Sequence, residues 1–323
     1  MESVLTVKQR FGIIGDNPKL NRAIEKSIQV ANSDISVLVT GESGVGKENI
    51  PKIIHQYSHR KHAKYIAVNC GAIPEGTIDS ELFGHEKGAF TDAKNARIGL
   101  FEAADQGTLF LDEIVGLSSE AQSKLLLALE NKIIRRVGGT KEIKIDVRII
   151  GAANQDLREM IKKGSFREDL FHRLDLLRIK IPPLATRAKD LAGLAEHLLS
   201  SLASKYKLPI PLIGPESIKS LCSNPWTGNI RELIHELERS LILTEPGNTL
   251  EIRTSHSLHS NSKPDDWLNE NFSFPESGFN LENEIIRLIQ MATFQTDGNI
   301  SEAARLLGVP RDYIRYRLKK KNS

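Results

Sequence analysis

The chain has 323 residues, of which 40% are hydrophobic, and its formal net charge is only +3. This length accommodates one large domain with a buried core and one or two small ones. No stretch approaches the roughly 18 uninterrupted apolar residues of a membrane span, and the amino-terminal residues lack the apolar core of a signal peptide. We therefore expect a cytoplasmic protein that does not bind a membrane.

The sequence contains two cysteines and one cluster of histidines that could suggest a metal site. Cys70 and Cys222 stand far apart and outside any CxxC pattern, so we expect two reduced, buried thiols and no zinc ribbon or disulfide scaffold. The segment HQYSHRKH places His55 and His59 at the i, i+4 spacing of a helix face. Since no carboxylate or cysteine joins them and the neighbouring Arg60 would repel a cation, we expect a solvated basic face there and not a metal site.

The first strong motif follows an apolar, β-branched run at residues 35–40, ISVLVT, which predicts a strand. The glycine-rich segment GESGVGKE comes next, and a helical pattern begins at Asn49. In this order the pattern G-x-x-x-x-G-K is typical of a P-loop, whose backbone N–H groups surround phosphates. Lys47 is expected to reach the β- and γ-phosphates, although Glu48 stands where Ser or Thr usually contacts Mg²⁺. The expected nucleotide-binding residues here are Gly41, Glu42, Ser43, Gly44, Val45, Gly46, Lys47 and Glu48.

A second apolar strand, TLFLDE at 108–113, ends in paired carboxylates. At the carboxyl edge of a parallel sheet, Asp112 is expected to hold Mg²⁺ or its water, and Glu113 to polarise the water that attacks the γ-phosphate. The alternative is an acidic N-cap of the next helix, which the P-loop upstream makes less favourable. A third strand, VRIIGAAN at 147–154, ends in Asn154, which fits a γ-phosphate sensor and a strand-end turn equally well.

A helix is expected between the second and third strands. Ser119 and Gln122 form a capping-box pattern at its start. Leu125, Leu126 and Leu129 make an apolar face, so we expect them in the core.

The carboxyl-terminal part follows a stretch rich in Ser, Asn and Pro at 246–279, which interrupts the hydrophobic periodicity and indicates a linker. Residues 297–323 then carry seven Lys and Arg against three Asp and Glu, a balance of +4. Two helical patterns are followed by a third, which Pro310 is expected to open at its first position. Three short helices with a tight turn predict a helix-turn-helix.

In the third of these helices, Ile314 and Leu318 are spaced i, i+4 and are expected to face the core. The residues left for the major groove are Arg311, Asp312, Arg315 and Tyr316, and those expected to meet phosphates are Lys319, Lys320 and Lys321. The alternative is a solvated helix end whose basic residues complement the helix dipole.

The order of GESGVGKE, ELFGHEKGAFTDA, GTLFLDE, FREDLFHRL and NPWTGNIRELIHELER, before a short helix-turn-helix, resembles the bacterial enhancer-binding activators of sigma-54 RNA polymerase. These are AAA+ ATPases, and the resemblance covers nearly the whole chain. It implies an α/β fold, an AAA+ P-loop NTPase with a parallel sheet and a helical lid, plus a small all-α domain of the Fis type. The implied domains are an ATPase core at 1–182 with a sigma-54 interaction loop at 84–95, a lid at 183–245, a linker at 246–279 and a helix-turn-helix at 280–323.

The resemblance also assigns roles that the patterns alone leave open. In the family, the loop GAFTGA contacts sigma-54 through its Phe and Thr, which match Phe90 and Thr91. The residues expected in this contact are Gly88, Ala89, Phe90, Thr91, Asp92 and Ala93. Asn69 matches the residue that restrains the Walker B glutamate, so it would pair with Glu113.

Three further matches concern the nucleotide. Arg167 and Arg173 match arginine fingers that act on ATP bound by the neighbouring subunit; without the resemblance they fit surface ion pairs equally well. Arg231 matches the sensor II arginine. Ile14 lies where the family cradles adenine.

The sequence departs from the family pattern in four places. Asp92 replaces the second glycine of GAFTGA, and IVGLSSE at 114–120 replaces an IGELP-type run. Ala185 replaces an arginine, and Val45 stands where threonine is commoner. Only Asp92 lies in the loop expected to contact sigma-54.

The resemblance implies a transcriptional activator that uses ATP and Mg²⁺. It would bind double-stranded DNA upstream of promoters, assemble into a ring expected to be a hexamer, and remodel the sigma-54 RNA polymerase closed complex by ATP hydrolysis. Since the chain starts at the ATPase domain without a receiver or sensor domain, we expect control by expression level or by a separate regulatory protein. The alternative is a DNA-binding repressor or adaptor with a vestigial ATPase, as Asp92 would allow. A generic AAA+ chaperone or replication ATPase would not explain the loop and the helix-turn-helix together.

Overall fold

The structure is a computed structural model, and it describes residues 3–91, 93–244, 248–250, 252, 281–296 and 298–320. The chain divides into two compact units, residues 1–261 and residues 262–323.

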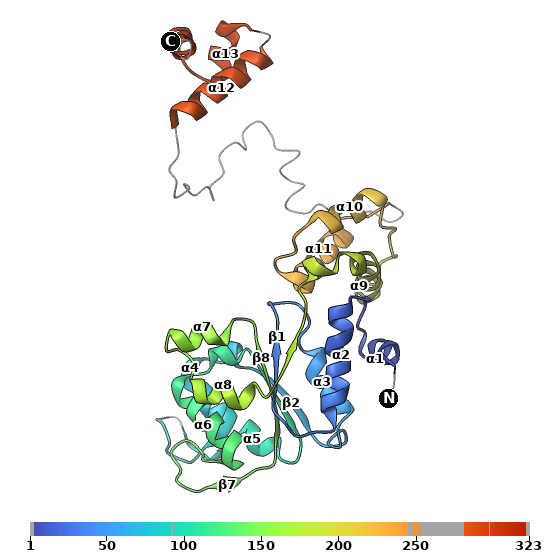
Figure 1. Cartoon of the computed structure of the whole chain (residues 1–323), viewed down its shortest axis with the longest axis vertical. Helices are drawn as coiled ribbons and strands as arrows, with labels where there is room; N and C mark the ends of the chain where they lie inside the picture. The colour runs from blue at the N-terminus through green and yellow to red at the C-terminus, as the bar shows by residue number, and fades with distance from the viewer. Residues whose placement is uncertain are drawn as a thin grey trace. The chain divides into compact units, whose positions relative to one another are not determined.

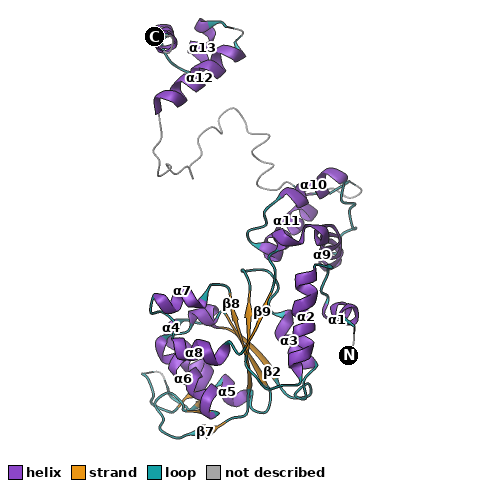
Figure 2. Cartoon of the chain, viewed as in Figure 1, coloured by secondary structure: helices purple, strands orange, loops and turns teal. Residues whose placement is uncertain are grey.

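The first unit is built on a five-stranded parallel sheet with the strand order β2, β5, β8, β1, β9 (Figure 2). Its strands are β1 (Val37–Thr40), β2 (Tyr65–Asn69), β5 (Thr108–Asp112), β8 (Arg148–Ala153) and β9 (Leu177–Lys180). The register pairs Asn69 with Asp112 and Thr40 with Ala153, so the carboxyl ends of these strands lie along one edge. Ligands of open α/β sheets bind at this edge.

Helices cover both faces of this sheet, as a parallel sheet requires (Figure 1). Val37 and Val39 of β1 pack with α2 (Pro18–Ala31) and α3 (Asn49–Gln56) on one face. Leu38 packs in the other core, with α6 (Ser119–Asn131) and α8 (Glu168–Leu174). Successive side chains of a strand point to opposite faces, so the continuous apolar run of β1 fills both cores.

Shorter elements complete the part of the first unit that precedes the lid. Its other helices are α1 (Val4–Phe11), α4 (Glu75–Phe83), α5 (Leu100–Ala103) and α7 (Leu157–Lys162), with short 3₁₀ turns η1 (Cys70–Ala72) and η2 (Ile114–Gly116). Two antiparallel hairpins join β3 (Gly84–His85) to β4 (Arg97–Ile98) and β6 (Ile133–Ile134) to β7 (Ile143–Lys144).

A helical lid follows β9. It contains η3 (Leu184–Asp190), α9 (Leu191–Tyr206), α10 (Pro215–Ser223) and α11 (Asn229–Leu243). Leu199, Leu221 and Leu237 pack in one core around the fully buried Trp226. The indole Nε1 of Trp226 donates a hydrogen bond of 2.8 Å to the carbonyl of Leu221, so its polar atom is satisfied inside this core.

The described residues of the second unit form three helices, α12 (Leu281–Gln295), α13 (Ile300–Leu306) and α14 (Arg311–Lys320). Ile289, Ala303 and the fully buried Ile314 form its core, and Leu318 packs against them. The predicted core positions of the third helix are therefore confirmed. The helix begins at Arg311, one residue later than the position expected from Pro310.

Two local predictions were wrong, the capping box of Ser119 and Gln122 and the burial of Cys222. The N-cap of α6 is Ser118, not Ser119, and Gln122 instead bonds the carbonyls of Leu117 and Ser165. Cys222 is exposed, whereas Cys70 is buried as expected.

The expected solvated basic face at 55–62 was wrong for His55 and Arg60, whereas His59, Lys61 and His62 are exposed. α3 ends at Gln56, so His55 and His59 do not share a helix face. His55 is buried and hydrogen-bonds Thr108, and the buried Arg60 pairs with Asp34 and Asp146. In the described part of the chain, no helix is long and apolar enough to cross a membrane.

Candidate functional site

The glycine-rich loop lies between β1 and α3 at the carboxyl edge of the sheet. Gly44 and Gly46 have positive φ values of 74° and 89°, which glycine adopts without the steric cost of a Cβ. At Gly44 a Cβ would also lie 2.3 Å from the carbonyl oxygen of Gly228. This loop therefore requires glycine both for its backbone conformation and for its close approach to the lid.

Lys47 is buried at the end of this loop. Its Nζ donates hydrogen bonds to the carbonyls of Gly41 (2.8 Å) and Glu42 (2.9 Å), so the ammonium group lies across the loop. Burial lowers the pKa of Lys47, while the charges of Asp112 and Glu113 oppose this shift. An ammonium group in this position can hold phosphate oxygens.

Asp112 is the last residue of β5, and Glu113 follows it as the N-cap of η2. Burial raises the pKa of Asp112, against the lowering effects of the Glu113 backbone amide and of Lys47. Glu113 has left-handed backbone angles, which turn the chain sharply out of the sheet. The two adjacent carboxylates therefore lie in different surroundings.

One cavity, of about 340 Å³, brings these groups together. Its lining comes from the P-loop, the end of β5 and the first turns of α11: Ser43, Gly44, Gly46, Lys47, Glu48, Asp112, Glu113, Ile230, Arg231, Ile234 and His235. The donor set fits a nucleotide with Mg²⁺, because Mg²⁺ is usually held by one or two carboxylates and by substrate phosphates. Among the described residues no group of three or more His, Cys, Asp or Glu side chains that could hold a metal ion is present.

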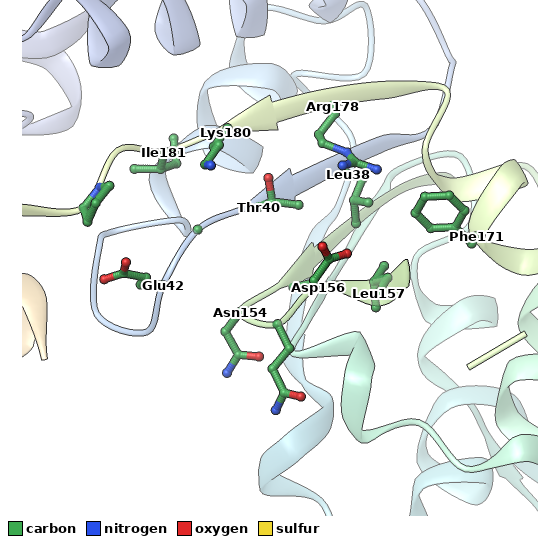
Figure 3. A pocket seen from close by; sticks show the side chains of 14 residues that line it. Leu38, Thr40, Glu42, Asn154, Asp156, Leu157, Phe171, Arg178, Lys180 and Ile181 are labelled. Atoms are coloured by element: carbon green, nitrogen blue, oxygen red, sulfur yellow. The ribbon is translucent and has the colours of Figure 1, made fainter. Parts of the chain in front are cut away.

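Asn154 lines a second cavity, of about 320 Å³, between the ends of β1, β8 and β9 (Figure 3). Thr40 and Glu42 reach it from one side, and Asp156 and Lys180 from others. The side-chain oxygen of Asn154 is buried and has no hydrogen-bond partner within the described residues. Asn154 does not line the cavity that holds Lys47 and Asp112, so both hypotheses for it, a γ-phosphate sensor and a strand-end turn, stay open.

Asn69 lies next to Asp112 in the strand register. Its side-chain oxygen accepts hydrogen bonds from the amides of Gly71 (2.8 Å) and Ala72 (3.2 Å), which caps η1. A Cβ at Gly71 would lie 2.4 Å from a carboxylate oxygen of Glu113 and 3.3 Å from the oxygen of Asn69. Within the described structure both side chains therefore flank Gly71, without the hydrogen bond expected between them.

Arg167 and Arg173 lie at the two ends of α8 and are exposed. Arg167 pairs with Asp169, and Arg173 pairs with Glu130 at 2.8 Å. Both thus make the surface ion pairs that were the alternative hypothesis. Their role as arginine fingers stays a prediction.

The lid meets the P-loop at the start of α11. Arg231 Nη1 donates a hydrogen bond of 3.2 Å to the hydroxyl of Ser43. Asn229, which the sequence did not single out, donates to Glu42 and to the carbonyl of Ser43, both at 3.0 Å. Its place between Gly228 and Arg231 in GNIREL was the only available signal.

Two other expected nucleotide residues contribute differently. Val45 is buried in the core between β1, α2 and α3, so its side chain does not face a ligand. Ile14 packs against the lid core, and its carbonyl accepts a hydrogen bond of 2.7 Å from Arg187.

The loop expected to contact sigma-54 projects from the β3–β4 hairpin. Hydrogen bonds from Gly88 N to the carbonyl of Ala93 (2.8 Å) and from Ala93 N to the carbonyl of Phe90 (2.9 Å) close its tip. Phe90 is 45% exposed with its ring edge against His85, and Thr91 is exposed. Ala93 is buried, so its methyl group is not offered to a partner in this conformation. Asp92 lies outside the described residues.

On α14 of the second unit, the expected DNA-reading side chains are all exposed: Arg311, Asp312, Arg315 and Tyr316. They surround the buried Ile314, which fixes the helix against α12 and α13. The side chains of Lys319 and Lys320, and the whole of Lys321, lie outside the described part.

Three family models match the chain along its length. They are the Sigma-54 interaction domain at residues 13–180, the AAA+ ATPase lid domain at 185–266, and the Bacterial regulatory protein, Fis family, at 287–320.

Several curated relatives match nearly the whole chain. The regulatory protein AtoC of Escherichia coli K12 is 40% identical over 98% of this chain and 69% of its own length. The Nif-specific regulatory protein of Azotobacter vinelandii is 41% identical over 98% of this chain and 60% of its own length. XylR of Pseudomonas putida is 39% identical over 97% of this chain and 57% of its own length. The chain thus spans between about half and two thirds of the length of such relatives.

Solved structures of NtrX from Brucella abortus are also similar. One matches with a TM-score of 0.73 and 30% identity, covering 99% of this chain and 71% of that one. Another, solved in complex with ATP, matches with a TM-score of 0.70 and 31% identity, covering 95% of this chain and 68% of that one. The predicted fold, an AAA+ P-loop NTPase with a helical lid and a helix-turn-helix, is confirmed.

Proposed function

Because the chain belongs to the family of sigma-54-dependent transcriptional activators with a Fis-type helix-turn-helix, we propose that it hydrolyses ATP to remodel the sigma-54 RNA polymerase closed complex. The observation that carries this proposal is the convergence of Lys47, Asp112, Glu113 and Arg231 on one cavity. The NtrX structure in complex with ATP supports a nucleotide as its ligand.

The residues of the cavity divide the chemistry between them. Lys47 and the P-loop amides hold the β- and γ-phosphates, and Glu113 orients and polarises the attacking water. The water oxygen bonds to the γ-phosphorus, the bond to the β–γ bridging oxygen breaks, and ADP and phosphate leave. Mg²⁺, when bound, would neutralise charge on the phosphates, and Asp112 would hold it.

The arginines complete this site from a second copy of the chain. A guanidinium group stabilises negative charge on the transferring phosphoryl group, and the exposure of Arg167 and Arg173 at the two ends of α8 is compatible with this role. Hydrolysis then depends on assembly into a ring, for which we propose a hexamer. The exposed Phe90 and Thr91 present the contact for sigma-54, and α14 binds DNA upstream of the promoter.

The test is transcription in a purified system with either sigma-54 polymerase or polymerase carrying the housekeeping sigma factor. We expect open complexes only with sigma-54, and only when the nucleotide can be hydrolysed. Promoter opening with a non-hydrolysable ATP analogue, or repression that needs no ATP, would contradict the proposal.

A further inference from the structure

Asn229 is the first residue of α11, and it is completely buried. Its backbone is in the left-handed region at φ 55°. Asparagine enters this region more readily than other residues with a side chain, but at some cost. A buried amide side chain must also find hydrogen-bond partners away from water. Asn229 therefore combines two features that cost free energy, a left-handed backbone and a fully buried polar side chain.

The side chain of Asn229 joins three segments that are distant in sequence. Its oxygen accepts a hydrogen bond of 2.7 Å from the amide of Leu184, at the start of the lid. Its nitrogen donates to a carboxylate oxygen of Glu42 and to the carbonyl of Ser43, both at 3.0 Å. The two ends of the amide cannot be exchanged, because Leu184 N is a donor and the two P-loop atoms are acceptors.

The neighbours of Asn229 bring the same turn of helix onto the P-loop. The amide of Ile230 donates a hydrogen bond of 3.0 Å to the carbonyl of Gly44. Gly228 approaches Gly44 so closely that a side chain at position 44 would collide with it. Arg231, two residues after Asn229, lines the cavity with Lys47. The attachment of α11 to the P-loop at Asn229 therefore determines where Arg231 lies in that cavity.

We propose that Asn229 is a positioning residue that couples the lid to the P-loop. It holds α11 so that Arg231 reaches the phosphates of the nucleotide, and it transmits movement of Glu42 and Ser43 to the lid through Leu184. Asn229 does not touch the nucleotide and acts through Arg231. The inference rests on the proposed ATPase function, and it adds the residue that links nucleotide binding to lid position.

Asn229→Asp tests this with almost no change in shape. The carboxylate can still accept from Leu184 N, but it cannot donate, and it faces the carboxylate of Glu42 and the carbonyl of Ser43. We expect ATP turnover to fall at least about tenfold, since misplacing a catalytic group by ~1 Å can cost on the order of 100-fold. Asn224→Asp is the matched control, because Asn224 is also a buried asparagine of the lid and lies outside the cavity. Its turnover should stay near that of the unsubstituted chain.

Two comparisons separate positioning from general destabilisation. In Glu42→Gln/Asn229→Asp the glutamine amide can donate to the new carboxylate, so turnover should recover relative to Asn229→Asp alone. Arg231→Ala should cause a large loss in the unsubstituted chain and little further loss when added to Asn229→Asp, because the arginine is already misplaced.

The outcomes distinguish this inference from the function on which it rests. An unsubstituted chain that does not hydrolyse ATP overturns the proposed function. If that chain hydrolyses ATP and Asn229→Asp matches it, or if Arg231→Ala and Asn229→Asp add independently, the coupling role of Asn229 is overturned and the ATPase stands.

Discussion

The carboxylate of Asp112 accepts a 2.9 Å hydrogen bond from the backbone amide of Glu113, whose own backbone is left-handed at φ 52° and ψ 49°. The chain turns at this point, so Asp112 faces the buried Lys47 while the carboxylate of Glu113 lies over Gly71. Two adjacent carboxylates thereby acquire different environments, which is how one site can assign them different roles.

The first prediction follows from that division. Lys47→Ala should weaken ATP binding, because it removes the ammonium group that holds the phosphates. Glu113→Ala should still bind ATP but lose hydrolysis by about 10²- to 10⁴-fold, the usual contribution of a general base. Equilibrium binding of a fluorescent ATP analogue and phosphate release, measured on the same samples, would check both. Full hydrolysis by Glu113→Ala would refute the role given to it.

The second prediction concerns pH. Burial raises the pKa of Asp112 and lowers the pKa of Lys47, so both limbs of the kcat/KM profile should lie nearer to neutrality than the ordinary Asp and Lys values. Because the pKa of Asp112 is higher in the folded than in the unfolded state, its protonated form contributes to the free energy of unfolding. This contribution is lost as pH rises through the folded-state pKa. Asp112→Asn should therefore raise the Tm of the nucleotide-free protein at neutral pH.

Its control is the same pair of proteins at a pH below the ordinary pKa of aspartate. There Asp112 is protonated in the folded and unfolded states alike, so the two Tm values should converge. A Tm difference that does not change with pH would mean that packing, and not the ionisation of Asp112, causes it.

Much of the fold was predictable because its signals are local. The β-branched run before the P-loop and the carboxylates after TLFLDE each identify a strand end within a few residues. The P-loop and these carboxylates then lie close together, because the carboxyl ends of parallel strands meet at one edge of the sheet. The role of Asn229 was not predictable, because it depends on hydrogen bonds to residues 45 to 187 positions away.

The burial of polar residues was also not predictable from the sequence. Arg60 looked solvated among histidines and lysines, yet Asp34 and Asp146 neutralise it from 26 and 86 residues away. His55 turns inward to bond Thr108. Such partners become adjacent only through tertiary packing, which a local charge pattern does not record.

The third prediction tests the arginines in trans. If Arg167 and Arg173 act on a neighbouring site, ATPase activity per chain should rise with protein concentration, and either Arg→Ala change should abolish the rise without preventing ATP binding. Arg135→Ala is the control, since Arg135 is an exposed arginine that pairs with Glu142 in the same way. Concentration-independent turnover in a monomeric sample, established by sedimentation, would exclude action in trans.

The fourth prediction concerns DNA. Arg315 is exposed in the middle of α14, so Arg315→Ala should cost about 1–3 kcal/mol at the specific site and relax sequence preference. Lys320→Ala should weaken binding uniformly across sequences and reduce the salt slope by about 1. Titration of specific and scrambled duplexes at several salt concentrations measures both. A larger change in preference from Lys320→Ala than from Arg315→Ala would reverse the two assignments.

The last prediction concerns the loop that carries Phe90 and Thr91. Hydrogen bonds of Gly88 and Ala93 close the loop, and the ring of Phe90 lies against His85. Asp92 replaces a glycine of the family pattern, which removes the freedom to adopt positive φ at low cost and adds a negative charge beside Thr91. We expect a working activator with a retuned loop, because the aromatic and hydroxyl side chains are retained.

Asp92→Gly compared with the unsubstituted chain tests this, with ATP turnover and sigma-54 open-complex formation measured on the same preparations. Turnover should be similar in the two proteins, because position 92 belongs to the loop and not to the cavity that holds Lys47. Open-complex formation should occur in both and differ in rate, and the difference should shrink with added salt if the charge of Asp92 is its cause. If the unsubstituted chain hydrolyses ATP and never opens a promoter while Asp92→Gly does, the natural protein is a repressor or adaptor whose ATPase is uncoupled from sigma-54.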